Sequence, residues 1–400
     1  MSTSNKRVVV NERQYCSVCE SNDLIELMNL PGLPITGLFS RRRQTASHPG
    51  IDQSLLWCPH CGQGQLAQQV NPSILYDSKK YSFKTSASST ARQGTQNFIS
   101  YLKTISGDKK FNCVLDVGCN DLYLLNELKS FSKHRIGIDP IWLSNKLDDI
   151  DSSIDLIGGT IEDTDLDKTL PCKPDLILCR HTLEHIFDPQ LVLRKLINFS
   201  ADDATFLFEV PGFDSLVTKG RFDQVFHEHL QYFSMGSFSV LMQRCNVRLT
   251  GYSENYHDWG ALIFAFKKGR GKQRKLDFPY SEEDLVRKMK LFTGQMENTR
   301  KTLYEFANTQ IYGYGAALMV PVLAYHLKSD LSFLKGIIDD DKEKDGLYYL
   351  NLPLRVHHAS KIGDLQKLTI FITAVDNVKP LMTRLLSDRP RHIIFPFHTI

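Results

Sequence analysis

The chain lacks any long apolar run, and this absence limits where the protein can reside. None of its 400 residues belongs to an uninterrupted apolar segment of about 20 residues, the length that a membrane-spanning helix needs. The opening stretch, Met1 to Val10, is polar and basic and has no apolar core of signal-peptide length. We therefore expect a cytoplasmic protein without a membrane partner.

The chain also lacks a strong net charge. Its 48 Lys and Arg residues nearly balance its 45 Asp and Glu residues, which leaves a formal charge of +3. The basic run at 267–275 has no interleaved aromatic residues of the kind that stack on bases, so we interpret it as a linker. We expect no nucleic-acid partner. At 42% hydrophobic residues, a chain of this length can bury more than one core.

Nine cysteines are present, and in a cytoplasmic protein we expect thiols or metal ligands rather than disulfides. Cys16-x-x-Cys19 and Cys58-x-x-Cys61 each form a pair that can present two thiolates from one tight turn. Together they predict a four-cysteine zinc site, with no open position for chemistry and hence a structural role. The alternatives are a redox pair, four thiols without a ligand, or His60 in place of one cysteine.

The stretch from Val114 to Asp121, followed by Ile136 to Asp139, predicts a strand, a tight turn, a helix and a second strand. Gly118 permits the sharp exit from the first strand. Asp139 ends the second strand, where a carboxylate can accept hydrogen bonds from a ribose diol. The alternative is an ordinary turn whose acidic residues cap helices.

Two features of this turn disfavour a nicotinamide cofactor. The third glycine of G-x-G-x-x-G is missing, and Asp116 would place a negative charge where a pyrophosphate is repelled. A sulfonium cofactor with an ammonium group would be attracted instead. We therefore predict that S-adenosylmethionine is bound by a set of residues in and after this turn, namely Asp116, Gly118, Asn120, Asp121 and Asp139.

Residues 105–270 alternate apolar strand-like runs with helical patterns, which predicts an α/β fold with a doubly wound parallel sheet. The expected strands are Val114 to Gly118, Arg135 to Asp139, Ile154 to Gly158, Asp175 to Arg180 and Thr205 to Val210, with edge strands at Val247 to Tyr252 and Ala261 to Lys267. The other expected units are a zinc-binding domain (1–70), a substrate-covering loop and linker (71–104), a linker with a long helix (271–308) and a C-terminal domain (309–400).

The C-terminal segment repeats the pattern of strand, glycine turn, helix and acid-ended strand. Ile311 to Gly315 gives the first strand and turn, and Asp339 ends the next strand. This predicts a second Rossmann-like domain. Its glycines could offer backbone N–H groups to a phosphate, or they could serve only packing.

Two histidine-rich segments follow predicted strands, at the sheet edge where doubly wound folds bind ligands. His181 and His185 come after the fourth strand, and the run His227-Glu228-His229 comes after the fifth. An imidazole titrates near neutral pH, so one histidine of the second run is a candidate general base. Alternatively, His227 and His229 bind a metal with His185 and Glu228, or the histidines are hydrogen-bonded in the core.

With these residues identified, the chain resembles the three-domain bacterial sugar C-methyltransferases, which act on nucleotide-linked keto-deoxysugars. The likeness covers nearly the whole length. It depends on the four cysteines, on the D-V-G-C-N-D turn from Asp116 to Asp121, and above all on Phe222 to Ser234, F-D-Q-V-F-H-E-H-L-Q-Y-F-S. Weaker support comes from Gly313 to Ala317 and from Ile337 to Asp340.

The resemblance implies a mechanism. His229 would remove the acidic proton beside a ketone, and the resulting enolate would attack the methyl group of the cofactor. Glu228 lies beside that base, and His185 would hydrogen-bond the enolate oxygen. The nucleoside diphosphate would lie between the central and C-terminal domains. The residues expected to contact the substrate are Tyr76 and Tyr81 of the covering loop, with Phe226 and Tyr314.

The chain departs from the family pattern at three positions. Phe226 replaces a tyrosine, Leu122 replaces a glycine of the cofactor turn, and Met319 occupies the position of a lysine. Phe226 and Met319 favour the alternative of an O- or N-methyltransferase acting on a related nucleotide-sugar or glycan. A non-catalytic zinc-containing scaffold is a further alternative, and a dehydrogenase ranks below these because of Asp116.

Overall fold

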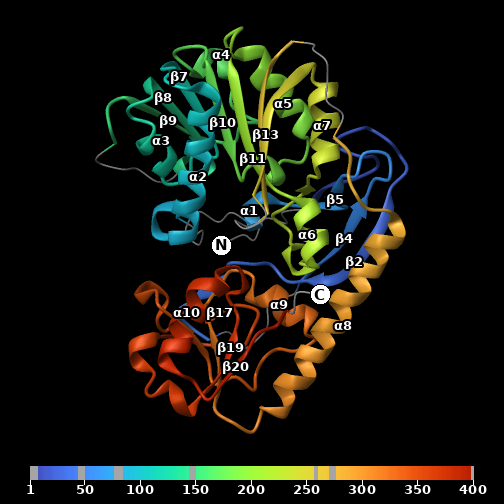
Figure 1. The fold of residues 1–400 in the computed structure, drawn as a ribbon, viewed down its shortest axis with the longest axis vertical. Coiled ribbons are helices and arrows are strands. Elements are labelled where there is room, and N and C mark those ends of the chain that lie inside the picture. Colours follow the sequence, from blue (N-terminus) through green and yellow to red (C-terminus); the bar gives the residue numbers. More distant parts are fainter. Residues whose placement is uncertain are drawn as a thin grey trace, which may run out of the picture.

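A computed structural model of the chain describes residues 8–43, 50–75, 84–143, 150–255, 260–269 and 276–397. Tyr76 and Tyr81 lie outside the described residues. The fold is mixed α/β, as predicted, with two larger sheets at opposite ends of the molecule and a smaller N-terminal sheet beside them (Figure 1). Within the described part of the chain, every helix is too short or too polar to cross a membrane.

The central sheet has seven strands in the order β13-β14-β11-β10-β7-β8-β9. Five neighbouring strands are parallel, which confirms the predicted doubly wound sheet. Strand β14 is antiparallel to both of its neighbours, so this end of the sheet is antiparallel. The direction of winding reverses between β7 and β10, the position where such folds bind ligands. The strands are β7 (Phe111–Val117), β8 (Ser132–Asp139), β9 (Ile154–Gly158), β10 (Leu176–Arg180), β11 (Thr205–Pro211), β13 (Val247–Asn255) and β14 (Ala261–Lys268).

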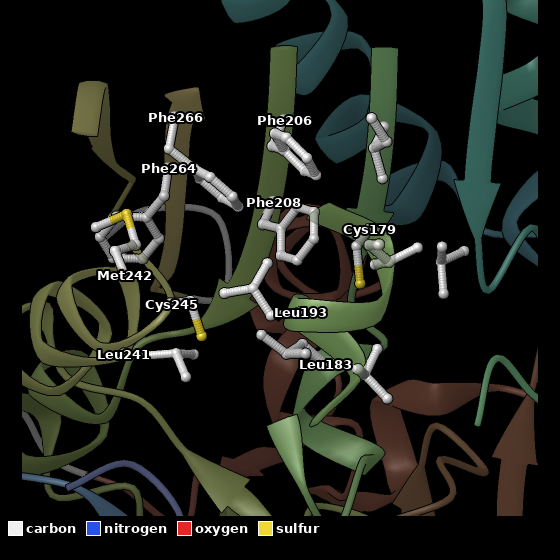
Figure 2. Packing of buried hydrophobic residues seen from close by; sticks show 14 of the residues in the cluster. Cys179, Leu183, Leu193, Phe206, Phe208, Leu241, Met242, Cys245, Phe264 and Phe266 are labelled. Atoms are coloured by element: carbon white, nitrogen blue, oxygen red, sulfur yellow. The ribbon is translucent and has the colours of Figure 1, made fainter. Parts of the chain in front are cut away.

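Aromatic packing holds the antiparallel edge to the helices that cover it. Phe206 of β11 and Phe266 of β14 stack with ring centroids 5.0 Å apart. Figure 2 shows Phe208 of the same cluster next to Leu193 of α5, and Phe264 next to Met242 of α7. The shorter helices of the central domain are α3 (Tyr123–Glu127), α4 (Leu166–Thr169), α5 (Pro189–Phe199), α6 (Phe213–Lys219) and α7 (Met235–Arg244).

Helix α2 (Ser89–Ser106) occupies much of the segment that we expected to be a loop and linker at 71–104. Phe98, Ile99 and Leu102 are buried in one cluster with Val114 of β7. The Ser88 side chain caps the helix by accepting from the backbone N–H of Ala91. The apolar stripe of α2 can be seen in the sequence. We did not predict the helix because the stripe follows a serine- and threonine-rich stretch whose composition suggests a linker.

The N-terminal segment shares strands with both of the other parts of the chain. Its four-stranded sheet has the order β12-β5-β4-β2, and β12 comes from the central part of the chain. Another short strand, β3, pairs with β17 of the C-terminal segment. The N-terminal residues therefore connect both larger domains. The strands are β1 (Val9–Glu12), β2 (Ile25–Leu33), β3 (Phe39–Ser40), β4 (Ile51–Trp57), β5 (Gly64–Leu66), β6 (Gln68–Val70), β12 (Gln231–Tyr232) and β17 (Tyr348–Tyr349), with helix α1 (Pro72–Leu75) after β6.

The C-terminal domain has a five-stranded parallel sheet in the order β18-β16-β15-β19-β20, which confirms a second Rossmann-like unit. The long helix α8 (Glu282–Glu305) leads into it along one side of the molecule (Figure 1). A long helix was predicted in this segment; Ser281 caps it, and Leu285 and Phe292 lie on its buried face. The other elements are β15 (Ile311–Tyr314), α9 (Val320–His326), β16 (Ile337–Asp339), β18 (Val356–His358), β19 (Thr369–Ile372), α10 (Val378–Asp388) and β20 (His392–Ile394).

One cysteine pair differs from the expectation of free thiols. Cys113 of β7 and Cys172 are joined in a disulfide. The segment before β10 crosses the start of β7, where the backbone N–H of Asp175 donates to the carbonyl of Cys113 at 3.0 Å. The expected cellular compartment gives no information on how close Cys113 and Cys172 lie in the fold. The other seven cysteines form no disulfide.

Candidate functional site

A cavity of about 600 Å³ lies at the carboxyl edge of the central sheet. Its walls come from the ends of β7, β8, β10 and β11 and from residues near α1 and the start of α2. Its volume is that of a small-molecule site, and its position is the one that doubly wound folds use for ligands.

The glycine turn after β7 brings the backbone close to the cavity. Gly118 has φ 81, and a Cβ there would lie 2.0 Å from Oγ1 of Thr182, so a side chain does not fit. Asn120 also lines the cavity. Leu122, which replaces the family's glycine, adopts φ 65 and buries its side chain in the core. This left-handed conformation is costly for leucine, but the turn is formed nevertheless.

Asp139 ends β8 at the cavity wall, as predicted. Its two carboxylate oxygens accept from the backbone N–H groups of Asn120 and Ile141, both at 2.9 Å. Each oxygen keeps a further acceptor position, so the carboxylate can still receive a ribose hydroxyl. The cavity, the side-chain-free approach at Gly118 and this carboxylate together fit the nucleoside part of S-adenosylmethionine.

Two other predicted cofactor residues do not line the described cavity. Asp116 is buried in β7, and its burial, reinforced by Asp139, raises its pKa to about 7. Neighbouring residues of a strand face opposite sides, and Val117 is the one that lines the cavity. The Asp116 carboxyl group therefore does not face the ligand, as we had expected it to. Asp121 instead accepts from the backbone N–H of Ser86 at 2.9 Å.

Two imidazoles meet at one side of the cavity. His185, at the end of the short helix η3 (Leu183–His185), lines the cavity, and the ring of His229 lies 4.9 Å from it, centroid to centroid. The Nδ1–H of His185 donates to the backbone carbonyl of Glu228 at 2.8 Å, which fixes the ring. Burial lowers the pKa of His185 to about 4 and that of His229 well below its usual value. Both rings are therefore uncharged at neutral pH.

The two residues that precede His229 in the sequence, His227 and Glu228, have different environments. An Oε1 atom of Glu228 accepts from the hydroxyl of Thr36 at 2.6 Å, and burial raises the pKa of Glu228 to about 7. His227 is buried, and its Nε2–H donates to the carbonyl of Leu33 at 2.9 Å. His227 is thus directed toward the N-terminal segment, where it cannot act as the base or share a metal with His229. The i, i+2 argument failed because this segment is a turn and not a strand.

Sequence reasoning named His181 but missed the charged side chains around it, of which Arg180 and Glu209 also line the cavity. Arg180 forms an ion pair with Glu209, and His181 lies between two acids, with Nε2 3.8 Å from Glu209 and Nδ1 3.5 Å from Glu184. His181 also has φ 48, a strained backbone conformation typical of functional sites. The sequence signal that could have identified Arg180 and Glu209 is their position near the ends of two apolar strands, β10 and β11.

The two predicted substrate residues that the structure describes, Phe226 and Tyr314, are not brought together. The ring of Phe226 packs against His229 with centroids 4.2 Å apart, so the position that holds a tyrosine in the family presents an apolar face. Tyr314 instead lines a second cavity of about 300 Å³ in the C-terminal domain, and its hydroxyl donates to Asp340 at 3.1 Å. Tyr314 therefore does not share the cavity of His185.

The glycine turn of the C-terminal domain serves packing. A Cβ on Gly315 would lie 2.2 Å from the Cβ of Ala374. The backbone N–H of Ala316 donates to Asp339 at 2.6 Å, and the Nζ of Lys344 lies 3.6 Å from the same carboxylate. These internal contacts satisfy the turn, which weakens the hypothesis that it receives a phosphate.

The four N-terminal cysteines converge as predicted. Their sulfur atoms lie within 4.8 Å of one another, with Cys16 and Cys61 at 3.6 Å and Cys19 and Cys58 at 3.4 Å. Tetrahedral zinc with Zn–S bonds of about 2.3 Å places its sulfurs about 3.8 Å apart, so the arrangement fits zinc. His60 is exposed and pairs with Asp23 at 3.2 Å, so it is not a ligand.

Gln231 of β12 links this cysteine site to the histidine segment. Its Oε1 accepts from the hydroxyl of Ser17 at 2.7 Å and from the amide of Gln63 at 3.0 Å. Its Nε2 donates to the carbonyls of Ile186 and Phe187, which directly follow η3. The turns that carry the four cysteines therefore help to position both segments that carry the imidazoles.

Comparisons with known proteins agree with this architecture. Residues 90–250 match the family model described as "Methyltransferase domain", and residues 16–76 match the one described as "Putative zinc binding domain". C-methyltransferase NovU of Streptomyces niveus is 23% identical over 260 residues, which cover 64% of this chain and 61% of NovU. The chain thus spans less than two thirds of that relative. The central domain is an S-adenosylmethionine-dependent methyltransferase domain, and the N-terminal cysteines are a zinc site.

Solved structures with a similar fold include N-methyltransferase NodS from Bradyrhizobium japonicum WM9, which is 13% identical, with a TM-score of 0.35 over 45% of this chain and 97% of that one. The plantazolicin methyltransferase BpumL in complex with SAH is 15% identical, with a TM-score of 0.34 over 44% of this chain and 82% of that one.

Replacement of Asp139 by asparagine is expected to weaken S-adenosylmethionine binding by about 10- to 100-fold, the loss of a hydrogen bond to a charged acceptor. Isothermal titration calorimetry on the full chain measures this. Asp121→Asn is the matched control, because Asp121 contacts Ser86 and not the cavity, and it should bind within about twofold of the parent. Equal affinity in Asp139→Asn would contradict the placement of the ribose, and no binding by the parent would favour a non-catalytic scaffold.

Proposed function

We propose that this protein transfers a methyl group from S-adenosylmethionine to a carbon atom beside the ketone of a nucleotide-linked deoxysugar. The observation that carries this proposal is a pair of uncharged imidazoles, of which His185 lines the cofactor cavity and His229 lies against His185. A carbon acid of this kind needs a base, and burial keeps both rings in the basic form.

The chain's own residues support the following steps. S-adenosylmethionine supplies an electrophilic methyl group when bound. His229 takes the proton from the carbon beside the ketone, and the electron pair left behind forms an enolate whose carbon accepts the methyl group. His185 is fixed by the carbonyl of Glu228 and faces the cavity. Because its Nδ1 carries the proton of the neutral ring, its Nε2 can donate to the enolate oxygen only after gaining a proton.

The substrate class rests on likeness. The H-E-H segment is the most specific part of the resemblance to the sugar C-methyltransferases, and the printed name of NovU is that of a C-methyltransferase. The nucleoside diphosphate would lie between the central and C-terminal domains, which the N-terminal strands β2 and β3 connect.

The test is to identify the methylated atom. The full chain is incubated with nucleotide-linked keto-deoxysugars and S-adenosylmethionine that carries a ¹³C-labelled methyl group, and the product is examined by NMR. We expect the label to be bonded to a carbon. A label bonded to oxygen or nitrogen would overturn the proposal.

The second candidate function is O- or N-methylation of a related nucleotide-sugar or glycan. The specific observation in its favour is the apolar contact of Phe226 with His229, which removes a hydroxyl that could bind the sugar oxygen. The loss of that hydrogen bond costs roughly 1 to 3 kcal/mol if nothing replaces it. The same labelled product separates the two candidates.

A further inference from the structure

Glu184 is a buried carboxylate that the proposed reaction has not used. It lies in η3 between His181 and His185, and none of its surface is exposed. Neither carboxylate oxygen has a hydrogen-bond partner in the described part of the chain. An isolated buried charge is costly, so a carboxylate kept in such a place needs a cation nearby in at least one state of the protein.

The groups around Glu184 are mostly imidazoles. One oxygen of Glu184 and the ring nitrogens of His185 and His229 lie within 4.8 Å of one another. His181 Nδ1 is 3.5 Å from Oε1 of Glu184. The titratable and charged groups that face Glu184 are His181 and His185 beside it in the chain, Cys179 and Arg180 of β10, Glu209 of β11, and His229 of the segment before β12.

We infer that Glu184 is a positioning residue that balances the positive charge formed when the His185–His229 pair takes a proton from the substrate. This deepens the proposed function and rests on it. Protonation of His229 creates an imidazolium in a buried site, where the neighbouring imidazoles cannot compensate the charge. The carboxylate of Glu184, which lies within 4.8 Å, can compensate this positive charge. In molecules whose Glu184 is ionised, the proton moves from the substrate carbon to the imidazole, Glu184 keeps its charge through the step, and no electron is transferred.

The account predicts a pH dependence. Burial raises the pKa of Glu184 to about 8, so the carboxylate is largely protonated at pH 7 and ionises as the pH rises through that value. Because the ionised form is the one that stabilises an imidazolium, the rate of methyl transfer should rise between about pH 7 and 9. Glu184→Gln should lose this rise.

The direct experiment follows the ring signals of His185 and His229 by NMR during a pH titration of the full zinc-loaded chain without any sugar. In the parent, the ring signals should shift as Glu184 ionises near pH 8, and Glu184→Gln should abolish that step. Glu184→Asp, which keeps the charge, should restore part of the shift. Glu184→Gln should also lower the maximal rate while the affinity for S-adenosylmethionine stays the same.

Asp214→Asn is the matched control. Asp214 is another buried acid whose pKa burial raises, to about 6, but it accepts from the backbone N–H of Met235 and does not face the imidazoles. This variant should lower the melting temperature and leave the ring titration unchanged.

Two outcomes would overturn the inference. One is a ring titration in Glu184→Gln identical to that of the parent. The other is a second divalent ion, beyond zinc, that binds the parent and not Glu184→Gln, since Glu184 would then be a metal ligand. The titration needs no acceptor, so its failure is distinguishable from a failure of the proposed sugar methylation.

Discussion

Replacement of His229 by asparagine should lower the rate of methyl transfer by about 100- to 10,000-fold, the usual contribution of a general base. S-adenosylmethionine should still bind within about twofold of the parent, because His229 contacts His185 and is not among the described residues that line the cofactor cavity. The rate is measured as the formation of S-adenosylhomocysteine with a keto-deoxysugar nucleotide present.

His227→Asn is the control for this prediction. His227 is also a buried imidazole of the same segment, but its Nε2–H donates to the carbonyl of Leu33. Its replacement should lower the melting temperature and retain most of the rate per folded molecule. Full turnover in His229→Asn, or an equal loss in both variants, would contradict the assignment of the base.

Removal of the zinc should abolish both the order of the N-terminal sheet and the transfer activity. Structural zinc contributes on the order of 10 kcal/mol to the folding of the unit that binds it. Because β12 belongs to the same sheet and Gln231 contacts Ser17 and Gln63, the loss should extend to the histidine segment. Cys61→Ser, examined by metal analysis, hydrogen exchange of residues 225–233 and turnover, tests this coupling.

Two variants serve as controls for the zinc prediction. Cys245→Ser changes a buried thiol outside the cluster, and His60→Ala removes an exposed side chain that pairs only with Asp23 among the described residues. Both should retain one zinc ion and near-parent turnover. A zinc-free protein with unchanged exchange and full turnover would show that the N-terminal site is independent of the histidines.

Much of the fold could be predicted because its determinants are local. Short apolar runs followed by glycine turns, as at Val114 to Gly118, specify buried parallel strands, and a regular apolar stripe after Ser281 specifies α8. The cysteine spacing likewise predicted the zinc site, since each pair forms its turn within a few residues.

The remaining features depend on contacts between distant residues. The pairing of β12 with β5 and the bond from His227 to Leu33 join segments far apart in the chain, and no local pattern records them. The burial of Asp116 and the position of Glu184 depend on which way a side chain points. Sequence therefore predicted polar residues at the sheet edge where the cavity lies, but it could not tell which of them face the cavity.

The central claim, methyl transfer to carbon through an enolate, is tested most directly in deuterated water with the ¹³C-methyl donor and a keto-deoxysugar nucleotide. The account predicts a product whose labelled methyl group is bonded to the carbon beside the ketone, with loss of the solvent-exchangeable hydrogen at that carbon. Labelled methyl on oxygen or nitrogen, with the original hydrogens retained beside the ketone, would contradict it.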